Sequence, residues 1–148
     1  MKFKFTLLFF SFISVTIFLF GQNRATDVIG IWLTPGDNAA KIEIYKVGEK
    51  IFGKIAWMKN PNINGKPKLD SNNPNSSKRN VPRLGLEIMM GFTFNGTDEW
   101  KNGDIYDPES GKTYSAYLYL KDPNTLKLRG YIGFSFLGRT ETWTRSNY

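Results

Sequence analysis

The sequence contains no cysteine and no histidine among its 148 residues. Without cysteine there is neither a disulfide framework nor a thiol in the leader for lipid attachment. The same absences exclude Ser-His-Asp and Cys-His catalysis and the usual zinc ligand sets. A glycine-rich phosphate loop is also missing. An enzyme built on this chain would have to use carboxylates, tyrosine, lysine or arginine, and no cofactor or metal is expected.

Blocks of like charge are missing as well. The net charge of +7 arises from 20 basic and 13 acidic residues, and no run of five like charges occurs. A dispersed excess of this kind indicates a solvated basic surface. The sequence therefore gives no reason to expect nucleic-acid binding, which requires clustered basic residues.

The first 21 residues have the layout of a signal peptide. Lys2 and Lys4 precede an almost wholly apolar run over 5–20, and the small residue Gly21 follows. A transmembrane anchor is the alternative, but the run is shorter than the roughly 20 apolar residues that a span needs. We therefore expect export to the periplasm or beyond, with residues 22–148 as one domain and no stable membrane span. Loss of the two lysines would lower the net charge to +5.

The rest of the chain has the pattern of a β protein. Residues 105–145 predict four consecutive strands, separated by turn residues at 107–111, 122–124 and 138. A meander of this kind must close or cover its edges, as barrels and sandwiches do. A short helix running into a strand is the alternative for residues 84–94. The other expected strands lie at 28–33, 41–47, 50–58 and 100–106.

Residues 59–83 contain most of the prolines and asparagines and show no periodicity. A stretch longer than about 12–15 residues without secondary structure is usually a functional lid or disordered. We expect it to act as a lid at one mouth of the fold.

The last predicted strand combines charge with an aromatic residue. Strict alternation places Arg139, Glu141, Trp143 and Arg145 on one face and three threonines on the other. If Trp143 points inward, the charged side chains do too, and buried charges need partners. The favoured interpretation is a structural network in which Glu141 neutralises an arginine. The alternatives are arginines that await an anionic ligand, or threonines that point inward.

Carboxylate pairs are the only enzyme-like candidates. Two acids about 5–9 Å apart can act as the acid and nucleophile of a glycosidase. Asp107, however, begins a predicted β-turn, where aspartate is favoured for local hydrogen bonds. Residues 104–111 also resemble an oxygen-rich calcium loop, but they lack the EF-hand spacing, so a turn is favoured. The candidate pairs are Asp104 with Asp107 and Glu109, and Glu43 with Glu141.

Two family resemblances follow from these residues. The triplet Gly30-Ile31-Trp32, with Arg145 or Arg139 on a late strand, resembles the lipocalin and wider calycin arrangement. That resemblance implies a tryptophan across the closed end of the barrel with an arginine over its ring, a cation–π contact. It assigns structural closure to Gly30, Trp32, Trp143 and Arg145.

The second resemblance is to the bacterial family called domain of unknown function 2147. It covers nearly all of residues 28–145, and it implies a small exported protein with a calycin-like barrel and no established activity. A cysteine that some relatives carry near residues 44–50 is absent here, so no role of a thiol carries over. The matching motifs include Ile42-Glu43-Ile44-Tyr45, Gly53-Lys54-Ile55-Ala56-Trp57, Asp70 with Asn73-Pro74, and Trp143-Thr144-Arg145.

We therefore expect an all-β fold, a single antiparallel calycin-like barrel of about eight strands with one long Asn/Pro-rich loop. The favoured function is binding of a small apolar or amphiphilic, lipid-like molecule, rather than an enzymatic reaction. The alternatives are a cell-envelope interaction protein with a filled barrel, which would display Asp70, Asn73 and Arg83 on its surface, or a carboxylate-based hydrolase. No protein partner is specified. The predicted ligand-binding residues are Tyr45, Trp57, Tyr106, Tyr114 and Tyr131, with Arg129 or Arg139 at the polar head of the ligand.

Overall fold

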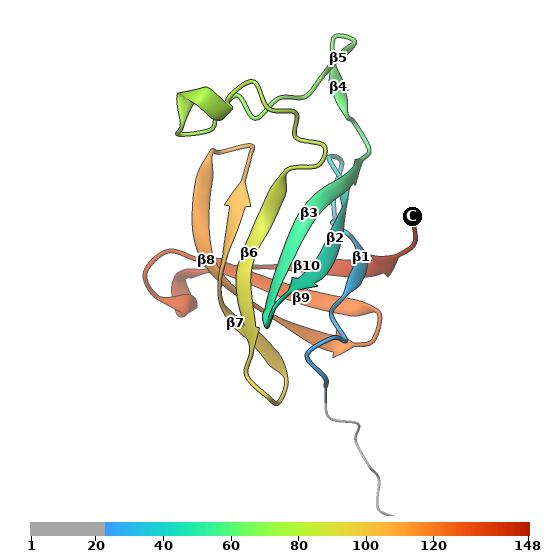
Figure 1. Cartoon of the computed structure of the whole chain (residues 1–148), viewed down its shortest axis with the longest axis vertical. Coiled ribbons are helices and arrows are strands. Elements are labelled where there is room, and N and C mark those ends of the chain that lie inside the picture. Colours follow the sequence, from blue (N-terminus) through green and yellow to red (C-terminus); the bar gives the residue numbers. More distant parts are fainter. Residues whose placement is uncertain (1–22) are drawn as a thin grey trace, which may run out of the picture.

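Eight antiparallel strands form a closed barrel, and a two-stranded hairpin lies outside it (Figure 1). The computed structural model describes residues 23–148, so the predicted leader lies outside the described residues. The barrel order is β1-β10-β9-β8-β7-β6-β3-β2, and the predicted antiparallel barrel is confirmed. The barrel strands are β1 (Gly30–Leu33), β2 (Ala40–Val47), β3 (Lys50–Met58), β6 (Glu87–Phe94), β7 (Glu99–Asp107), β8 (Lys112–Asp122), β9 (Thr125–Tyr131) and β10 (Arg139–Ser146).

The short elements all lie in connections. The hairpin of β4 (Asn62–Ile63) and β5 (Lys66–Pro67) and the 3-10 turn η1 (Ser76–Lys78) belong to the long segment between β3 and β6. A second 3-10 turn, η2 (Ser135–Leu137), lies between β9 and β10. Residues 132–138 thus form a longer connection than the single turn residue that the sequence predicted. Within residues 23–148, no helix has the length and apolar character needed to cross a membrane.

Alternation along the strands places the apolar residues inside. Ile42 and Ile44 of β2 are buried, and Leu126 and Leu128 of β9 are buried on the opposite wall. Burial of such side chains stabilises the fold by about 1.5–3 kcal/mol each. Since no disulfide is present, this core and the closed hydrogen-bond ladder hold the domain together.

The barrel is closed where its first and last strands meet. Trp32 is fully buried, and the guanidinium carbon of Arg145 lies 4.2 Å from the centre of its ring. Arg145 also donates hydrogen bonds to the carbonyl oxygens of Asp27 and Ile29, at 2.7 and 3.1 Å. Gly30 has a φ of +133°, and a Cβ there would lie 3.1 Å from the Arg145 guanidinium. Gly30, Trp32 and Arg145 therefore lie together at this junction, whereas Trp143, also expected to close the barrel, is buried in β10 and lines the cavity described below.

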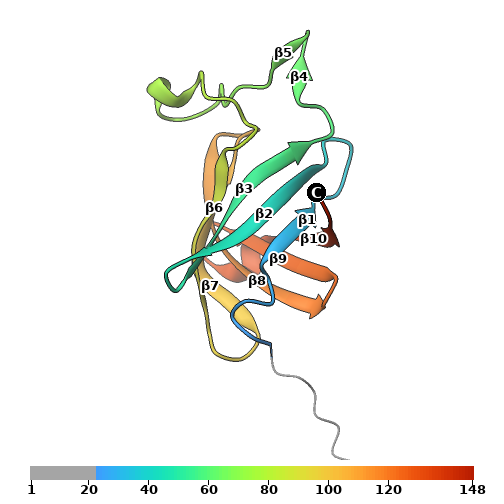
Figure 2. The ribbon, with the colours of Figure 1, turned by 45° about the vertical axis from the view of Figure 1, so that its right-hand side comes forward.

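The two ends of the barrel differ (Figure 2). At one end, residues 24–29 cover the opening, and the indole nitrogen of Trp100 donates a hydrogen bond to the Ala25 carbonyl at 3.0 Å. At the other end lie the β1–β2 connection, the β7–β8 turn and the long segment between β3 and β6. A ligand can enter only where side chains leave space, and the cavity described next is at this second end.

Candidate functional site

A cavity of about 620 Å³ occupies the second end of the barrel. Its inner wall is apolar and comes from strands on all sides. Volumes between about 300 and 1,000 Å³ are typical of small-molecule sites. The main wall residues are Ile42, Ile55, Ile88, Ile105, Leu128 and Trp143, and the rim includes Thr34, Pro35 and Asn38 of the β1–β2 connection.

Charged side chains from β10 lie at the rim of this cavity. Arg139 and Glu141 both line it, on the same face as Trp143. The Trp143 indole nitrogen donates a hydrogen bond to Glu141 Oε2 at 3.0 Å. Thr140 and Thr142 face away, where they accept hydrogen bonds from Arg129 and Lys127. The last strand therefore presents its charged face to the cavity and its threonines to the outside.

Arg139 is a cation without a partner. It is exposed at the rim, and its guanidinium makes no hydrogen bond or ion pair with any other residue between 23 and 148. The network in which Glu141 neutralises an arginine is not formed, because Glu141 bonds to Trp143 and no ion pair involves it among the described residues. The rim thus offers a guanidinium to a negatively charged group.

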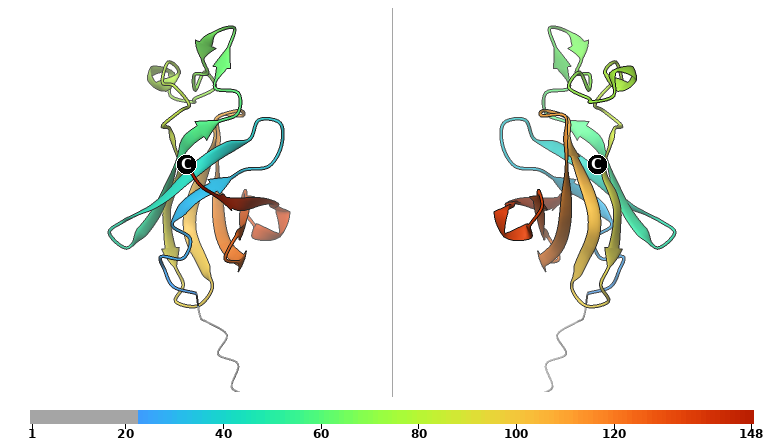
Figure 3. Two further views of the ribbon diagram at one scale, coloured as in Figure 1. Left: turned by 90° about the vertical axis from the view of Figure 1, so that its right-hand side faces the viewer. Right: turned by 90° about the vertical axis from the view of Figure 1, so that its left-hand side faces the viewer.

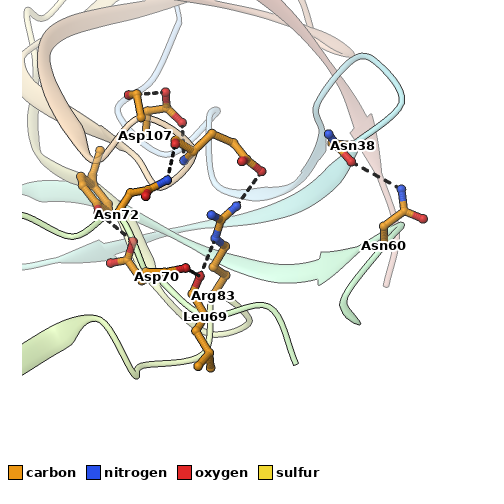
Figure 4. Close-up of polar contacts among 11 residues, drawn as sticks. Asn38, Asn60, Leu69, Asp70, Asn72, Arg83 and Asp107 are labelled. Carbon is orange, nitrogen blue, oxygen red and sulfur yellow. Dashed lines mark hydrogen bonds and ion pairs between the residues drawn. The ribbon is translucent and has the colours of Figure 1, made fainter. Parts of the chain in front are cut away.

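The long segment 59–86 is folded and attached to the barrel. It pairs with itself through a β-bridge between Leu69 and Pro82. Arg83 Nη1 forms an ion pair of 2.6 Å with Glu109 Oε1, and the Asn72 amide donates to the Glu109 carbonyl at 2.6 Å (Figure 4). A Cβ at Gly111 would overlap the Asn72 carbonyl. These contacts join the segment to the β7–β8 turn beside the cavity.

Asp70 is the centre of this attachment. Its side chain is fully buried and accepts hydrogen bonds from the Tyr106 hydroxyl at 2.7 Å and the Asn73 amide at 2.6 Å. Hydrogen bonds to a carboxylate are worth about 1.5–3 kcal/mol. Tyr106 belongs to β7 and lines the cavity, so one carboxylate connects the long segment to the barrel wall.

Burial of Tyr106, together with its hydrogen bond to Asp70, raises the pKa of the hydroxyl from 10.0 to about 12. A raised folded-state pKa means that this stabilisation is complete below pH 10 and is lost as the pH rises toward 12. We expect the free energy of unfolding to fall by about 2–3 kcal/mol more over this range in the wild type than in Tyr106→Phe. Urea unfolding at a series of pH values measures the difference, and parallel curves would contradict it.

Four of the seven predicted ligand-binding residues line the cavity: Tyr106, Tyr114, Tyr131 and Arg139. Tyr114 is half-buried in the wall. Tyr131 touches the rim, but its ring packs on the outer face of the barrel, 6.4 Å from that of Tyr117. The hydroxyl of Tyr106 is already engaged by Asp70, so this residue offers a ligand only its ring.

The other three predicted residues lie outside the cavity, contrary to expectation. Tyr45 faces outward because Ile42 and Ile44 fill the interior of β2. Its hydroxyl donates to Glu87 Oε2 at 2.6 Å, and burial together with this bond raises its pKa to about 12. Arg129 also faces outward, and it donates to the carbonyl oxygens of Ser135 and Phe136 in the η2 connection.

Trp57 is displaced by a β-bulge. Lys41 pairs with Trp57 and Ile42 pairs with Ile55, so Ala56 is an extra residue in β3. An extra residue reverses the alternation beyond it. Met58 consequently lines the cavity while Trp57 is 43% exposed, with the Lys41 ammonium 5.7 Å from its ring centre. Strict alternation through this strand predicted the opposite faces.

Sequence reasoning did not identify the polar residues around Asp70 as part of the site. Asp70, Asn73 and Arg83 were expected on the surface only for a filled barrel, and all three are buried. The Asp70–Asn73-Pro74 motif was the available signal, but its partner Tyr106 is 36 residues away. The rim residues Ile132 and Leu137 were also missed, since their segment resembles a strand.

Four of the five acidic candidates, Asp107, Glu109, Glu43 and Glu141, are bonded to other groups. Asp107 organises the β7–β8 turn, with Oδ1 accepting from the Glu109 amide and Oδ2 from the Ser110 hydroxyl. This arrangement is that of the predicted turn. Within residues 23–148, no cluster of three or more acidic side chains is placed to hold a metal ion. Glu43 pairs with Lys54 at 3.1 Å on the outer surface, whereas Glu141 faces the cavity.

Comparison with known proteins agrees with this architecture. The profile of DUF2147, described as uncharacterized proteins conserved in bacteria, matches residues 30–145. The barrel is similar to protein HP1028 from the human pathogen Helicobacter pylori, which is described as belonging to the lipocalin family. The TM-score is 0.72 at 24% sequence identity, over 80% of this chain and 82% of that one. No curated protein matches the chain.

Proposed function

Because the chain belongs to DUF2147, a family of uncharacterised bacterial proteins, membership brings no activity, and we propose from the cavity itself that the protein binds a small amphiphilic molecule. The observation that carries the proposal is an apolar cavity of about 620 Å³ with the unpartnered Arg139 at its rim. An acyl or other apolar chain would lie against Ile105 and Leu128, and an anionic head would meet Arg139.

We further propose that the protein acts outside the cytoplasm. Lys2, Lys4 and the apolar run that follows support export. An exported protein would meet amphiphiles in the periplasm or in the medium, where such molecules need a carrier or a scavenger. A filled barrel that meets only a protein partner has less support, since a cavity of this size is present and Asp70, Asn73 and Arg83 are buried.

The direct test is uptake of a fluorescent fatty-acid analogue by the purified mature protein. We expect saturable binding with a Kd of about 10 μM or lower, a common range for such sites. Native mass spectrometry of protein isolated from its own cell envelope would show whether a ligand co-purifies. Absence of saturable binding together with a ligand-free mass would contradict the proposal.

Gly130 offers a way to fill the cavity without distorting the fold. It lines the cavity in β9, and a Cβ there would contact Ile105 and Tyr114 at an ordinary 3.6 Å. We expect Gly130→Phe to fold normally, since phenylalanine favours strands, and to weaken binding about tenfold or more, a loss of about 1.4 kcal/mol. Gly130→Ala is the matched control and should bind as the wild type does. Equal binding by both variants would place the ligand elsewhere.

The charge at the rim can be tested separately. We expect Arg139→Gln to weaken binding of the anionic analogue about fivefold to tenfold, because a charge-assisted hydrogen bond is lost. A neutral analogue with the same chain should bind both forms equally. Lys50→Gln, at the opposite end of the barrel, is the control for a change in net charge alone. If Arg139→Gln leaves the affinity for the anionic analogue unchanged, Arg139 does not meet the head group.

A further inference from the structure

The connection between β9 and β10 displays four large apolar side chains to solvent. In the apolar loop, residues 132–137, the exposed fractions are 66% for Ile132, 66% for Phe134, 74% for Phe136 and 68% for Leu137. The rings of Phe134 and Phe136 stack with their centres 5.6 Å apart. Figure 3 shows the connection standing out from the side of the barrel. Exposed apolar clusters of this kind mark interaction surfaces.

The apolar loop is held in shape by its backbone rather than by burial of its side chains. Arg129 Nε donates to the Ser135 carbonyl at 2.7 Å, and Nη2 donates to the Phe136 carbonyl at 3.3 Å. The Leu137 amide donates to the Phe134 carbonyl at 3.1 Å. Carbonyl groups of this loop are therefore bound by β9 while its large apolar side chains face solvent.

The neighbouring strands present positive charge beside the apolar loop. Outward positions of β8, β9 and β10 alternate with the buried Ala116, Leu118, Leu126, Leu128 and Trp143. From 113 to 121, from 125 to 131 and from 140 to 144, these outward positions hold no carboxylate. On β9 they carry Lys127 and Arg129, and the carboxylate of Glu99, which lines the hollow beside Ser135, is paired with Lys101 at 2.6 Å.

We propose that the apolar loop docks the protein on an anionic lipid bilayer. Phe134 and Phe136 would enter the boundary between head groups and acyl chains, where aromatic side chains of peripheral proteins insert. Lys127 and Arg129 would face anionic head groups, which attract basic surfaces. Four side chains fall well short of the 20–30 residues that each side of a stable protein interface contributes, so a bilayer fits this small protruding surface better than a protein partner does.

The position of the apolar loop links docking to the cavity. Ile132 and Leu137 belong both to the loop and to the cavity rim. Contact with a bilayer would therefore bring the mouth of the cavity to the lipid surface. This inference goes beyond the proposed function, since a docked barrel could exchange any amphiphile with the membrane and docking itself needs no ligand.

The test is co-sedimentation of the purified mature protein with vesicles of phosphatidylcholine and phosphatidylglycerol. We expect wild-type protein to sediment with these vesicles, to sediment less with phosphatidylcholine alone, and to be released by salt, because screening weakens charge attraction. Phe134→Ser/Phe136→Ser should lower the vesicle affinity about tenfold or more. Val47→Ser, which alters an apolar side chain that is 57% exposed at the other end of the barrel, should bind as the wild type does.

The outcomes separate docking from the other possibilities. Circular dichroism and thermal unfolding check that the double variant is folded, as expected for exposed side chains. Gly130→Phe should still sediment with vesicles, so failure of ligand binding leaves the docking test intact. No vesicle binding by the wild type, or equal binding by the double variant, overturns the proposal. A concentration-dependent dimer that the double variant abolishes, without vesicle binding, would assign the apolar loop to a second copy of the chain instead.

Discussion

Trp32→Ala should lower the free energy of unfolding by about 3–5 kcal/mol, the range measured for truncation of a buried aromatic side chain. Trp32 is fully buried where β1 meets the closed end. The guanidinium carbon of Arg145 lies 4.2 Å from the centre of its ring, and its indole nitrogen donates a hydrogen bond to the Val28 carbonyl at 2.8 Å. Removal of the ring leaves a cavity and takes away one side of the cation–π contact. Urea unfolding followed by circular dichroism measures the change.

Trp57→Ala is the matched control for this prediction. Trp57 is also a tryptophan of an early strand, but it is 43% exposed on the outer surface. Truncation of an exposed side chain usually changes stability by about 0.5 kcal/mol or less, and loss of the contact with Lys41 adds little at an exposed site. If both variants lose the same amount of stability, the closed end does not depend on Trp32 in particular.

Asp70→Ala should lower the free energy of unfolding by about 4 kcal/mol and release the long segment between β3 and β6. The Tyr106 hydroxyl and the Asn73 amide would both lose their acceptor, and a buried donor left unpaired costs about 1–3 kcal/mol. The segment would then be held at the β7–β8 turn by the Asn72 bond to the Glu109 carbonyl and by the Arg83–Glu109 ion pair, in which the Glu109 side chain is 61% exposed. Such a pair contributes little by itself.

Limited proteolysis measures the release of this segment. We expect cleavage within residues 59–86 to be faster in Asp70→Ala than in the wild type, since protease sensitivity follows local opening. Ser71→Ala is the neighbouring control, because Ser71 is exposed and makes one hydrogen bond of 3.3 Å to the Leu69 carbonyl. Resistance of Asp70→Ala equal to that of the wild type would show that Asp70 does not anchor the segment. The segment anchored in this way lies at the mouth of the cavity, where the sequence predicted a lid.

The sequence was informative where a pattern runs along one strand. Alternation predicted strands at 41–47 and 50–58, which correspond to β2 and β3, and the turn residues at 107–111 separated β7 from β8 as observed. The same periodicity failed at Trp57, because the bulge at Ala56 is defined by the pairing of β2 with β3. A bulge in one strand is visible only against its partner.

The candidate site was likewise predicted from the sequence only in part. Arg139 was identified from the alternation of β10, and it lies at the cavity rim with no partner in the described part of the chain. Arg129, the other predicted arginine, instead donates a hydrogen bond to the Ser135 carbonyl in the η2 connection. The difference depends on which face of each strand points into the barrel. That orientation is set by pairing between residues that are far apart in sequence.

The sequence by itself indicated an all-β fold, because strands follow from local periodicity, and its resemblance to the calycin arrangement implied a barrel with an arginine over Trp32. Only the tertiary structure decided that the barrel keeps an apolar cavity, that Asp70 is buried against Tyr106, and that Phe134 and Phe136 are left outside. Each of these depends on contacts between distant segments. Burial is a property of the packed chain, and a hydrophobic residue in a sequence carries no mark of whether the fold will cover it.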